Sequence, residues 1–306
     1  MTLRTTLGAI TLLAAAAPAF AQDACTSVSL SDVGWTDITS TTSAAKQVLD
    51  ALGYDVDVQV LSVPVTFEAL SKGDIDVFLG NWMPSQQSAI QPYLDDASIE
   101  TLGINLEGTK YNLAVPTYLY DQGLHTYEDL AKFKDALDGK IYGIEPGNEA
   151  NTYLIGLTEA GKTLEGFEVV ESSEQGMLAQ VRRAVDAEEP VVFLGWEPHP
   201  MNSNFDLKYV EGGEDFFGGQ GNVYTVTRKG FAAECPNVAK LLQNMQFSLP
   251  MENEMMGLIL DDGMDPDEAV KQWLTEHPDT FDGWLAGVTT VDGSDGLAAV
   301  KSAMGL

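Results

Sequence analysis

The stretch IDVFLGNWMP, residues 75–84, indicates the fold class more clearly than any other part of the chain. It begins with an apolar run, broken only by Asp76, and Gly80 and Pro84 follow that run. Short apolar runs bounded by turn residues are typical of strands buried on both faces of a parallel sheet. We therefore expect a buried strand over 75–79, with Trp82 just past its carboxyl end.

The residues before this strand alternate between strand and helix patterns. Valines recur with a period of two over 56–60, and a short helical pattern around 67–71 ends at Gly73. Earlier still, a strand pattern over 28–33 precedes an amphipathic helix over 39–52, which Thr39 or Ser40 can cap. This order predicts a β-α-β-α-β unit.

The same architecture is repeated in the middle of the chain, and the last part is helical. Strands are expected near 111–115, 140–144, 167–170, 191–194, 207–210 and 223–226, and helices near 127–137, 149–159, 174–187, 251–260, 265–276 and 295–304. Two similar halves predict two α/β domains, as the length of 306 residues also does. We place one domain at 22–108 plus 208–306 and the other at 109–207.

The first 21 residues have the pattern of a cleaved secretory signal peptide. Arg4 is followed by an apolar run over 7–17 and by the triplet Ala19-Phe20-Ala21. The alternative is a transmembrane anchor, but the run is shorter than the roughly 20 residues that a bilayer requires. Secretion follows, and in an oxidising compartment we expect Cys25 and Cys235 to form a disulfide.

The charge balance limits the classes of partner. The formal net charge is −30, from 46 acidic and 16 basic residues. Nucleic acids and anionic membrane surfaces are therefore poor partners, whereas a cationic ligand is compatible. Acidity that only keeps a protein soluble would give the same composition.

Three tryptophans occupy similar positions after expected strands. Trp82 and Trp196 each lie in a motif with glycine and proline, FLGNWMP (78–84) and FLGWEP (193–198), and Trp35 follows the first strand. Ligands of open α/β sheets bind outside the carboxyl ends of the strands, so the three rings can converge on one cleft. Each could instead be a core or hinge anchor, the role that we assign to Trp273 and Trp284 in helical patterns.

Aromatic rings that converge suit a permanently charged ammonium group. A trimethylated nitrogen donates no hydrogen bonds, and the negative faces of rings replace its lost water at roughly 2 kcal/mol or more per desolvated ring. The carboxylate of Asp37 could offset the charge or accept from a ligand hydroxyl. Asp37 could instead cap the following helix.

Five stretches closely resemble the choline-binding periplasmic proteins of bacterial ABC importers, within the wider glycine betaine-binding group. They are VGWTDIT (33–39), FLGNWMP (78–84), YGIEPGN (142–148), ESSEQGM (171–177) and FLGWEPHP (193–200). The resemblance extends over nearly the whole mature chain. It implies a two-domain periplasmic binding protein fold of type II, with the ligand cleft between the domains and the trimethylammonium group in a box of rings.

Matched motif by motif, the resemblance gives each site residue a role. Trp35 and Trp82 on the first domain, and Tyr111 and Trp196 on the second, would be the four walls of the box. Asp37 would lie beside the cation. Asn148 would bind the hydroxyl end of the ligand, although Asn151 lies close enough in sequence to be an alternative.

Choline is favoured over zwitterionic ligands because a carboxylate requires cationic or backbone donors. No basic residue adjoins the tryptophan motifs, and Lys110 should face away from its strand neighbour Tyr111. Ionised Asp37 would also repel a carboxylate. Glycine betaine, trimethylamine oxide and dimethylsulfoniopropionate remain alternatives, since backbone donors near Asn148 could bind an anionic group.

Other functional classes find less support in the sequence. A secreted enzyme would need a reactive motif, and no nucleophile elbow, zinc-protease pair or phosphate loop occurs. Glu197 and His199 could be two metal ligands, but two do not make a site. We expect no catalysis, cofactor, metal, nucleic acid or membrane insertion. The expected protein is a monomer that closes on choline and delivers it to an ABC permease.

Overall fold

The structure is a computed structural model that describes residues 25–306. Within that range the strands form one mixed sheet in the order β2-β1-β3-β9-β4-β7-β5-β6, and β8 pairs with β4. The expected signal peptide, residues 1–21, lies outside the described residues. The strands are β1 (Ser27–Asp32), β2 (Asp55–Val60), β3 (Val77–Met83), β4 (Ile99–Pro116), β5 (Lys140–Tyr142), β6 (Glu168–Val170), β7 (Phe193–Glu197), β8 (Leu207–Tyr209) and β9 (Gly221–Arg228).

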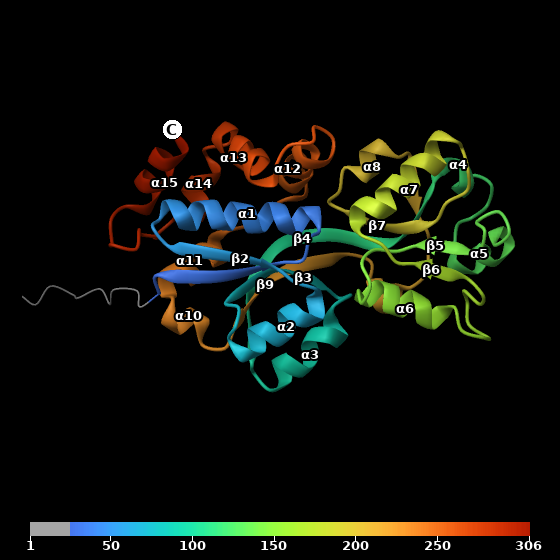
Figure 1. The fold of residues 1–306 in the computed structure, drawn as a ribbon, viewed down its shortest axis with the longest axis horizontal. Coiled ribbons are helices and arrows are strands. Elements are labelled where there is room, and N and C mark those ends of the chain that lie inside the picture. The colour runs from blue at the N-terminus through green and yellow to red at the C-terminus, as the bar shows by residue number, and fades with distance from the viewer. Residues whose placement is uncertain (1–24) are drawn as a thin grey trace, which may run out of the picture.

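The first part of the sheet is the β-α-β-α-β unit that the sequence predicts. β1 pairs in parallel with β2 and β3, and β9 is antiparallel to β3. Helix α1 (Thr36–Ala51) covers one face, and α2 (Val63–Lys72) and α3 (Gln87–Asp95) cover the other (Figure 1). As expected, α2 ends at Gly73, which has a left-handed backbone.

Helix α1 begins three residues before the predicted start, so the prediction that Thr39 or Ser40 caps it is wrong. Its N-cap is Trp35. The chain turns sharply after β1 because Gly34 has a φ of +79° and donates its N–H to Asp32. The hydroxyl of Thr39, inside the first turns, donates to the same carboxylate at 2.8 Å.

β4 is one long strand that takes part in both ends of the sheet. It pairs with β9 as far as Thr109, and with β7 from Lys110 onward. The sequence predicted only its last part, because three register shifts against β9 interrupt the alternation of apolar residues over 99–109. Gly103 and Gly108 lie in that interrupted part.

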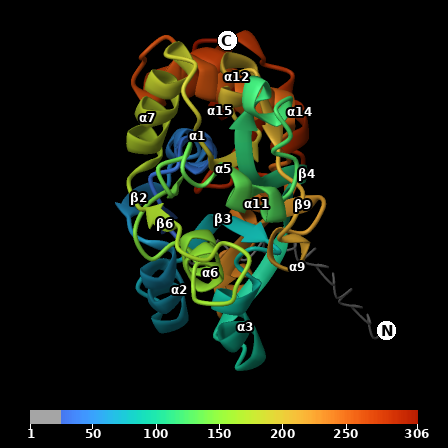
Figure 2. The ribbon, with the colours of Figure 1, turned by 90° about the vertical axis from the view of Figure 1, so that its right-hand side faces the viewer.

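The second part of the sheet carries its own helices. β5 pairs in parallel with β6 and β7, while β4 is antiparallel to β7 and β8. In Figure 2, β6 lies between α7 (Glu174–Asp186) and α6 (Glu149–Leu157). The shorter helices here are α4 (Thr117–Tyr120), α5 (Tyr127–Phe133), α8 (Met201–Asn204) and α9 (Glu214–Phe217).

The last helices return to the first part of the sheet, where α12, α13 and α15 pack against α1 (Figure 1). Trp273 and Trp284 are buried among them, as expected. The predicted domain limits, 22–108 plus 208–306 and 109–207, stay a prediction. The helices are α10 (Phe231–Glu234), α11 (Pro236–Asn244), α12 (Leu249–Leu260), α13 (Pro266–Glu276), α14 (Thr280–Trp284) and α15 (Gly296–Met304).

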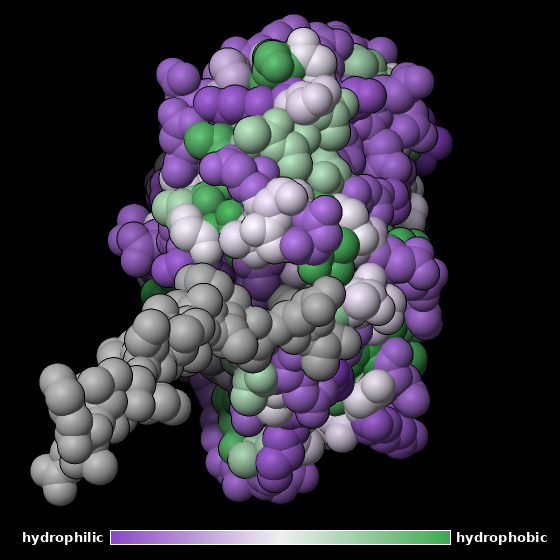
Figure 3. All heavy atoms as spheres, turned by 90° about the vertical axis from the view of Figure 1, so that its left-hand side faces the viewer, coloured by the Kyte–Doolittle hydropathy of each residue, from purple (hydrophilic) through white to green (hydrophobic). Residues whose placement is uncertain are grey.

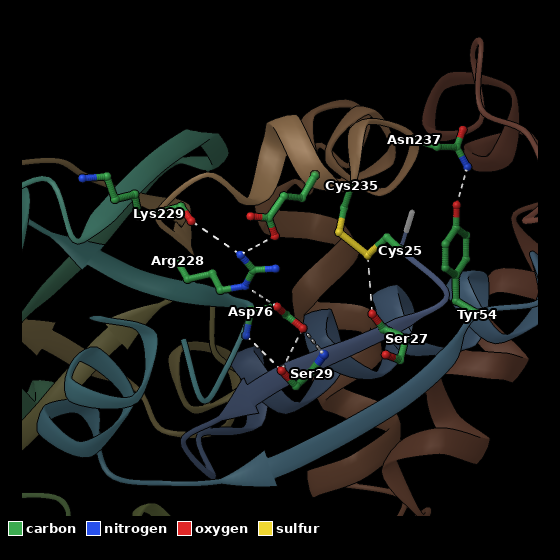
Figure 4. Close-up of a disulfide and its surroundings, with 10 residues drawn as sticks. Cys25, Ser27, Ser29, Tyr54, Asp76, Arg228, Lys229, Cys235 and Asn237 are labelled. Carbon is green, nitrogen blue, oxygen red and sulfur yellow. Dashed lines mark hydrogen bonds and ion pairs between the residues drawn. A yellow bond between two sulfur atoms is a disulfide. The ribbon is translucent and has the colours of Figure 1, made fainter. Parts of the chain in front are cut away.

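The predicted disulfide between Cys25 and Cys235 is present. It joins the residues before β1 to the junction of α10 and α11, across 210 residues of sequence. Figure 4 shows Arg228 beside it, where its guanidinium pairs with Asp76 at 2.6 Å. Cys25, the first residue that the structure describes, is therefore fixed to the same part of the molecule as the C-terminal helices.

Figure 3 shows the end of the molecule that carries the C-terminal helices. Hydrophilic residues dominate this surface, and hydrophobic residues form only small groups on it. Over residues 25–306, no helix combines the length and the apolar character needed to cross a bilayer.

Candidate functional site

All six of the predicted ligand-binding residues line one pocket. Its cavity volume is about 20 Å³, so the lining residues enclose a narrow space. Elements from both parts of the sheet contribute to it, so it lies where β3, β4 and β7 meet the starts of α1 and α6. The lining residues are Trp35, Asp37, Trp82, Ser85, Gln86, Tyr111, Ile144, Asn148, Glu149, Ala150 and Trp196.

Trp82 and Trp196 hold equivalent positions in their strands. Each is the penultimate residue, in β3 and in β7 respectively. The prediction that they lie past the strand ends is wrong, because both strands continue through the motif to the residue before proline. The prolines themselves, Pro84 and Pro198, both follow cis peptide bonds.

Tyr111 joins the rings from the two parts of the sheet. It lies directly opposite Trp196 in the β4–β7 pairing. Its ring centroid is 6.1 Å from that of Trp82 and 6.2 Å from that of Trp196, both edge to face. Phe217 packs behind it at 5.0 Å. These separations match the usual geometry of aromatic pairs, so the walls support one another.

Asp37 is the only carboxylate among these lining residues that is fully buried. Its Oδ2 accepts a hydrogen bond from the indole Nε1 of Trp82 at 3.0 Å. It does not cap α1, because it is the second residue of that helix. Burial, and next the charge of Glu174, raises the pKa of Asp37 to about 8. In this buried arrangement, without a ligand, the carboxyl therefore holds a proton near neutral pH.

Several polar atoms around the pocket have no hydrogen-bond partner among the described residues. They are Oδ1 of Asp37, both polar atoms of the Gln86 amide and the hydroxyl of Tyr111. Each such group costs roughly 1–3 kcal/mol when it is buried without a partner. Because all three residues line the same pocket, the cost is explained most simply by a polar ligand.

The two asparagines that the sequence could not separate have different positions. Asn148 lines the pocket and caps α6, with its Oδ1 accepting from the N–H of Ala150 at 2.8 Å. Its amide nitrogen donates weakly to Glu145 at 3.3 Å. Asn151 is fully buried away from the pocket, where it bonds to both backbone groups of Ile144. Asn148 is therefore the one that can reach a ligand.

Two further carboxylates, Glu145 and Glu149, adjoin or belong to the pocket lining. Oε2 of Glu145 accepts from the indole Nε1 of Trp35 at 2.9 Å, which fixes that ring. Glu149 lines the pocket and is half-buried, and burial raises its pKa to about 7. The pocket therefore has acidic groups on two sides.

No lysine, arginine or histidine is among the lining residues. Lys110 points away, as predicted, and pairs with Glu197 at 3.2 Å while half exposed. His199 bonds instead to Glu174 at 3.0 Å. Glu197 and His199 therefore face different partners, and they do not form the pair that a metal site would require.

Sequence reasoning missed five lining residues: Ser85, Gln86, Ile144, Glu149 and Ala150. Ser85 and Gln86 directly follow the FLGNWMP motif, so its extension by two residues would have found them. The other three adjoin Asn148 or its loop. Their role was hidden because neither periodicity nor residue type marks them.

Residues 26–276 match the family described as the substrate binding domain of ABC-type glycine betaine transport system. Over 133 residues the chain is 50% identical to an uncharacterized protein of Chromohalobacter salexigens, a match that covers 44% of this chain and 85% of that protein. Over 131 residues it is 33% identical to the glycine betaine/carnitine transport binding protein GbuC of Listeria monocytogenes, 43% of each chain.

Solved structures with the same architecture include proteins of known ligand. An ABC-transporter choline binding protein in complex with choline is 57% identical, with a TM-score of 0.88 over 92% of this chain and 98% of that one. An ABC-transporter choline binding protein in an unliganded semi-closed conformation gives a TM-score of 0.84, also at 57% identity, over 92% and 99%. Lactococcal OpuAC with glycine betaine is 27% identical, with a TM-score of 0.76 over 84% and 98%. The fold is therefore the expected type II binding-protein fold.

Proposed function

This chain belongs to the family of substrate-binding domains of ABC-type glycine betaine transport systems, and we propose that the solute it captures is choline. The family is one of transport proteins, and the proposed mechanism includes no chemical change of the ligand. The protein would bind choline between the two parts of its sheet, close on it and present the closed form to its permease.

One observation carries the proposal: four aromatic rings and a buried carboxyl group surround a pocket without a cationic side chain. Trp35, Trp82, Tyr111 and Trp196 line the pocket, and the negative faces of such rings attract a quaternary ammonium group that cannot donate hydrogen bonds. Asp37 supplies one negative charge when it is ionised. The lining therefore attracts the positive charge of a ligand, and it contains no cationic side chain that would bind a ligand carboxylate.

The choice of choline over glycine betaine rests on this asymmetry. A betaine carboxylate in the pocket would meet Asp37 and Glu149, and no lysine or arginine is among the lining residues. Asn148 and the start of α6 could donate to it, but one such site offsets only part of the cost of desolvating a carboxylate. Choline brings a hydroxyl instead, which Asn148 or Gln86 can bind.

The location and the partner follow from the same proposal. We infer that residues 1–21 direct secretion and are cleaved, and that the mature protein acts in the periplasm. The permease of an ABC importer would then recognise the closed form. Binding followed by release to a permease requires no catalytic group, which is the reason that we do not propose an enzyme.

Isothermal titration of the ligand-stripped mature protein tests the proposal. Choline should bind much more tightly than glycine betaine, and Trp196→Ala should weaken choline binding by about 30-fold or more, since one desolvated ring contributes roughly 2 kcal/mol. A preference for glycine betaine would assign the protein to the osmoprotectant carriers. Absence of binding to both ligands would contradict the proposal.

A further inference from the structure

Glu174 is a buried carboxylate that the proposed site does not use. It is the first residue of α7, and its side chain is completely buried. Oε2 accepts the backbone N–H of Thr36 at 2.8 Å, and Oε1 accepts the hydroxyl of Thr36 at 2.7 Å. Oε1 also lies 3.0 Å from Nε2 of His199. A buried charge with this many donors is held in one position.

Glu174 accepts a hydrogen bond from the N-terminus of helix α1. Its own N-cap, Trp35, makes no side-chain capping bond, so the first N–H groups depend on other parts of the chain. A carboxylate at a helix N-terminus is also favoured by the helix dipole. The neighbours of Thr36 in sequence are Trp35, which is one wall of the pocket, and Asp37, which is its buried carboxyl group. By bonding to Thr36, Glu174 therefore helps to position both.

His199 connects the same carboxylate to the opposite wall. Its Nδ1 lies 2.9 Å from the backbone N–H of Met201, which can only donate. The ring proton is therefore on Nε2, which donates to Glu174. The imidazole packs edge to face against Trp196, with centroids 4.8 Å apart. A continuous chain of contacts thus joins Trp196 to the start of α1.

We propose that Glu174 and His199 are positioning residues that form a latch, holding Trp35 and Asp37 against Trp196 when the pocket closes; this inference rests on the proposed binding of choline. Glu174 and His199 follow strands β6 and β7, whereas Thr36 follows β1, on the other side of the cleft. Opening the cleft separates Thr36 from Glu174. The bond between His199 and Glu174 lies within one side, so it keeps the carboxylate aimed at α1 for the next closure.

Stopped-flow kinetics with choline tests the latch in Glu174→Gln. The glutamine amide has nearly the shape of the carboxylate, but its NH₂ group replaces one acceptor oxygen and would face a hydrogen-bond donor. The dissociation rate of choline should therefore rise by about 30-fold, with little change in its association rate. His199→Phe should act in the same direction, and His199→Gln, which can still donate and accept, should recover most of the wild-type rate. The control is Glu189→Gln, an exposed carboxylate just after α7, which should leave both rates unchanged.

A merely structural role makes a different prediction. If Glu174 only supported the fold, Glu174→Gln would lower the thermal stability of the ligand-free protein, whereas the latch predicts almost no change, because the Thr36 bonds are broken in the open form. A dissociation rate within about threefold of wild type, or a large loss of ligand-free stability, would overturn the latch.

Hydrogen exchange separates this inference from the choline proposal. If the wild type fails to bind choline, the proposed function fails, and the latch is then judged on the ligand-free protein. The amide of Thr36 should exchange faster in Glu174→Gln than in the wild type, because transient closure no longer protects it. Equal exchange in the two proteins would overturn the latch.

Discussion

Asp37 and Gln86 present buried polar atoms to the pocket without partners inside the protein. In Asp37 one oxygen is held by Trp82 and the other is unpaired, so the side chain is oriented but its charge is not compensated. Gln86 is 1% exposed, and neither atom of its amide is bonded. Asp37 can therefore bind the cationic group of a ligand, and Gln86 can bind its hydroxyl group.

The raised pKa of Asp37 predicts that choline affinity increases with pH. In the arrangement of this structure, where Asp37 is fully buried, its carboxyl is protonated below a pKa of about 8. A bound cation favours the ionised form, so binding to this arrangement releases a proton. Affinity should rise about tenfold between about pH 7 and about pH 9 and then level off. Titration calorimetry in buffers of different ionisation enthalpy measures both the affinity and the protons released.

Other carboxylates near Asp37 must be separated from it. The charge of Glu174 on α7 raises the pKa of Asp37, and Asp37 in turn raises the pKa of Glu252 on α12. Glu149 on α6 lines the pocket, and its pKa is raised to about 7. Asp37→Asn is the control, since it should bind choline more weakly and lose most of the pH dependence. An unchanged pH profile in Asp37→Asn would exclude Asp37 as the titrating group.

The unpaired amide of Gln86 predicts a role in recognising the ligand hydroxyl. Gln86→Leu should weaken choline binding by about tenfold, the effect of one lost hydrogen bond in a buried site. Binding of tetramethylammonium, which has no hydroxyl, should change by less than about threefold. Parallel titrations of both ligands measure the difference. An equal loss for the two ligands would show that Gln86 acts on the shape of the pocket instead.

At the scale of elements, short turns after strands bring the site residues together. β1 leads through Gly34 into α1, and β5 leads through the 143–148 loop into α6. In the second case Asn151 holds the loop, bonding to the N–H of Ile144 at 3.2 Å and to its carbonyl at 2.8 Å. The position of Asn148 at the pocket therefore depends on a residue that does not reach the pocket.

Gly143 is necessary for this loop because Asn151 packs directly against it. A Cβ at position 143 would overlap Oδ1 of Asn151. Gly143→Ala should therefore lower the free energy of unfolding by about 1–3 kcal/mol and weaken choline binding. Gly156→Ala, in the same helix as Asn151 and with open space around the new Cβ, should instead stabilise by up to about 1 kcal/mol. Thermal denaturation and titration of both variants measure the contrast.

At the scale of the whole molecule, the disulfide fixes the N-terminal residues to the part that carries the C-terminal helices. Replacing Cys25 and Cys235 by serine should lower the free energy of unfolding by about 2–5 kcal/mol, because the bridge closes a long loop. The affinity for choline should stay the same, since neither cysteine lines the pocket. Chemical denaturation and titration of the double variant measure the two effects, and a large loss of affinity would show that the bridge influences the cleft.

The sequence predicted the alternation of strands and helices and the convergence of the tryptophans, because both depend on local patterns. Trp82 and Trp196 stand in repeated motifs, and the strand order then brings them together. The long course of β4 was missed because its register shifts break the period-two pattern. The partnership of Glu174 with Thr36 could not be predicted either, since it joins residues 138 apart in sequence, and only the folded chain brings them into contact.

The central claim is that the pocket recognises the positive charge of a trimethylammonium group rather than its shape. Titration of the wild-type protein with choline and with its neutral carbon analogue, in which a tert-butyl group replaces the trimethylammonium, separates the two. The account predicts that choline binds at least about 100-fold more tightly, since the rings and ionised Asp37 attract only the cation. Equal affinity for the two compounds would contradict it.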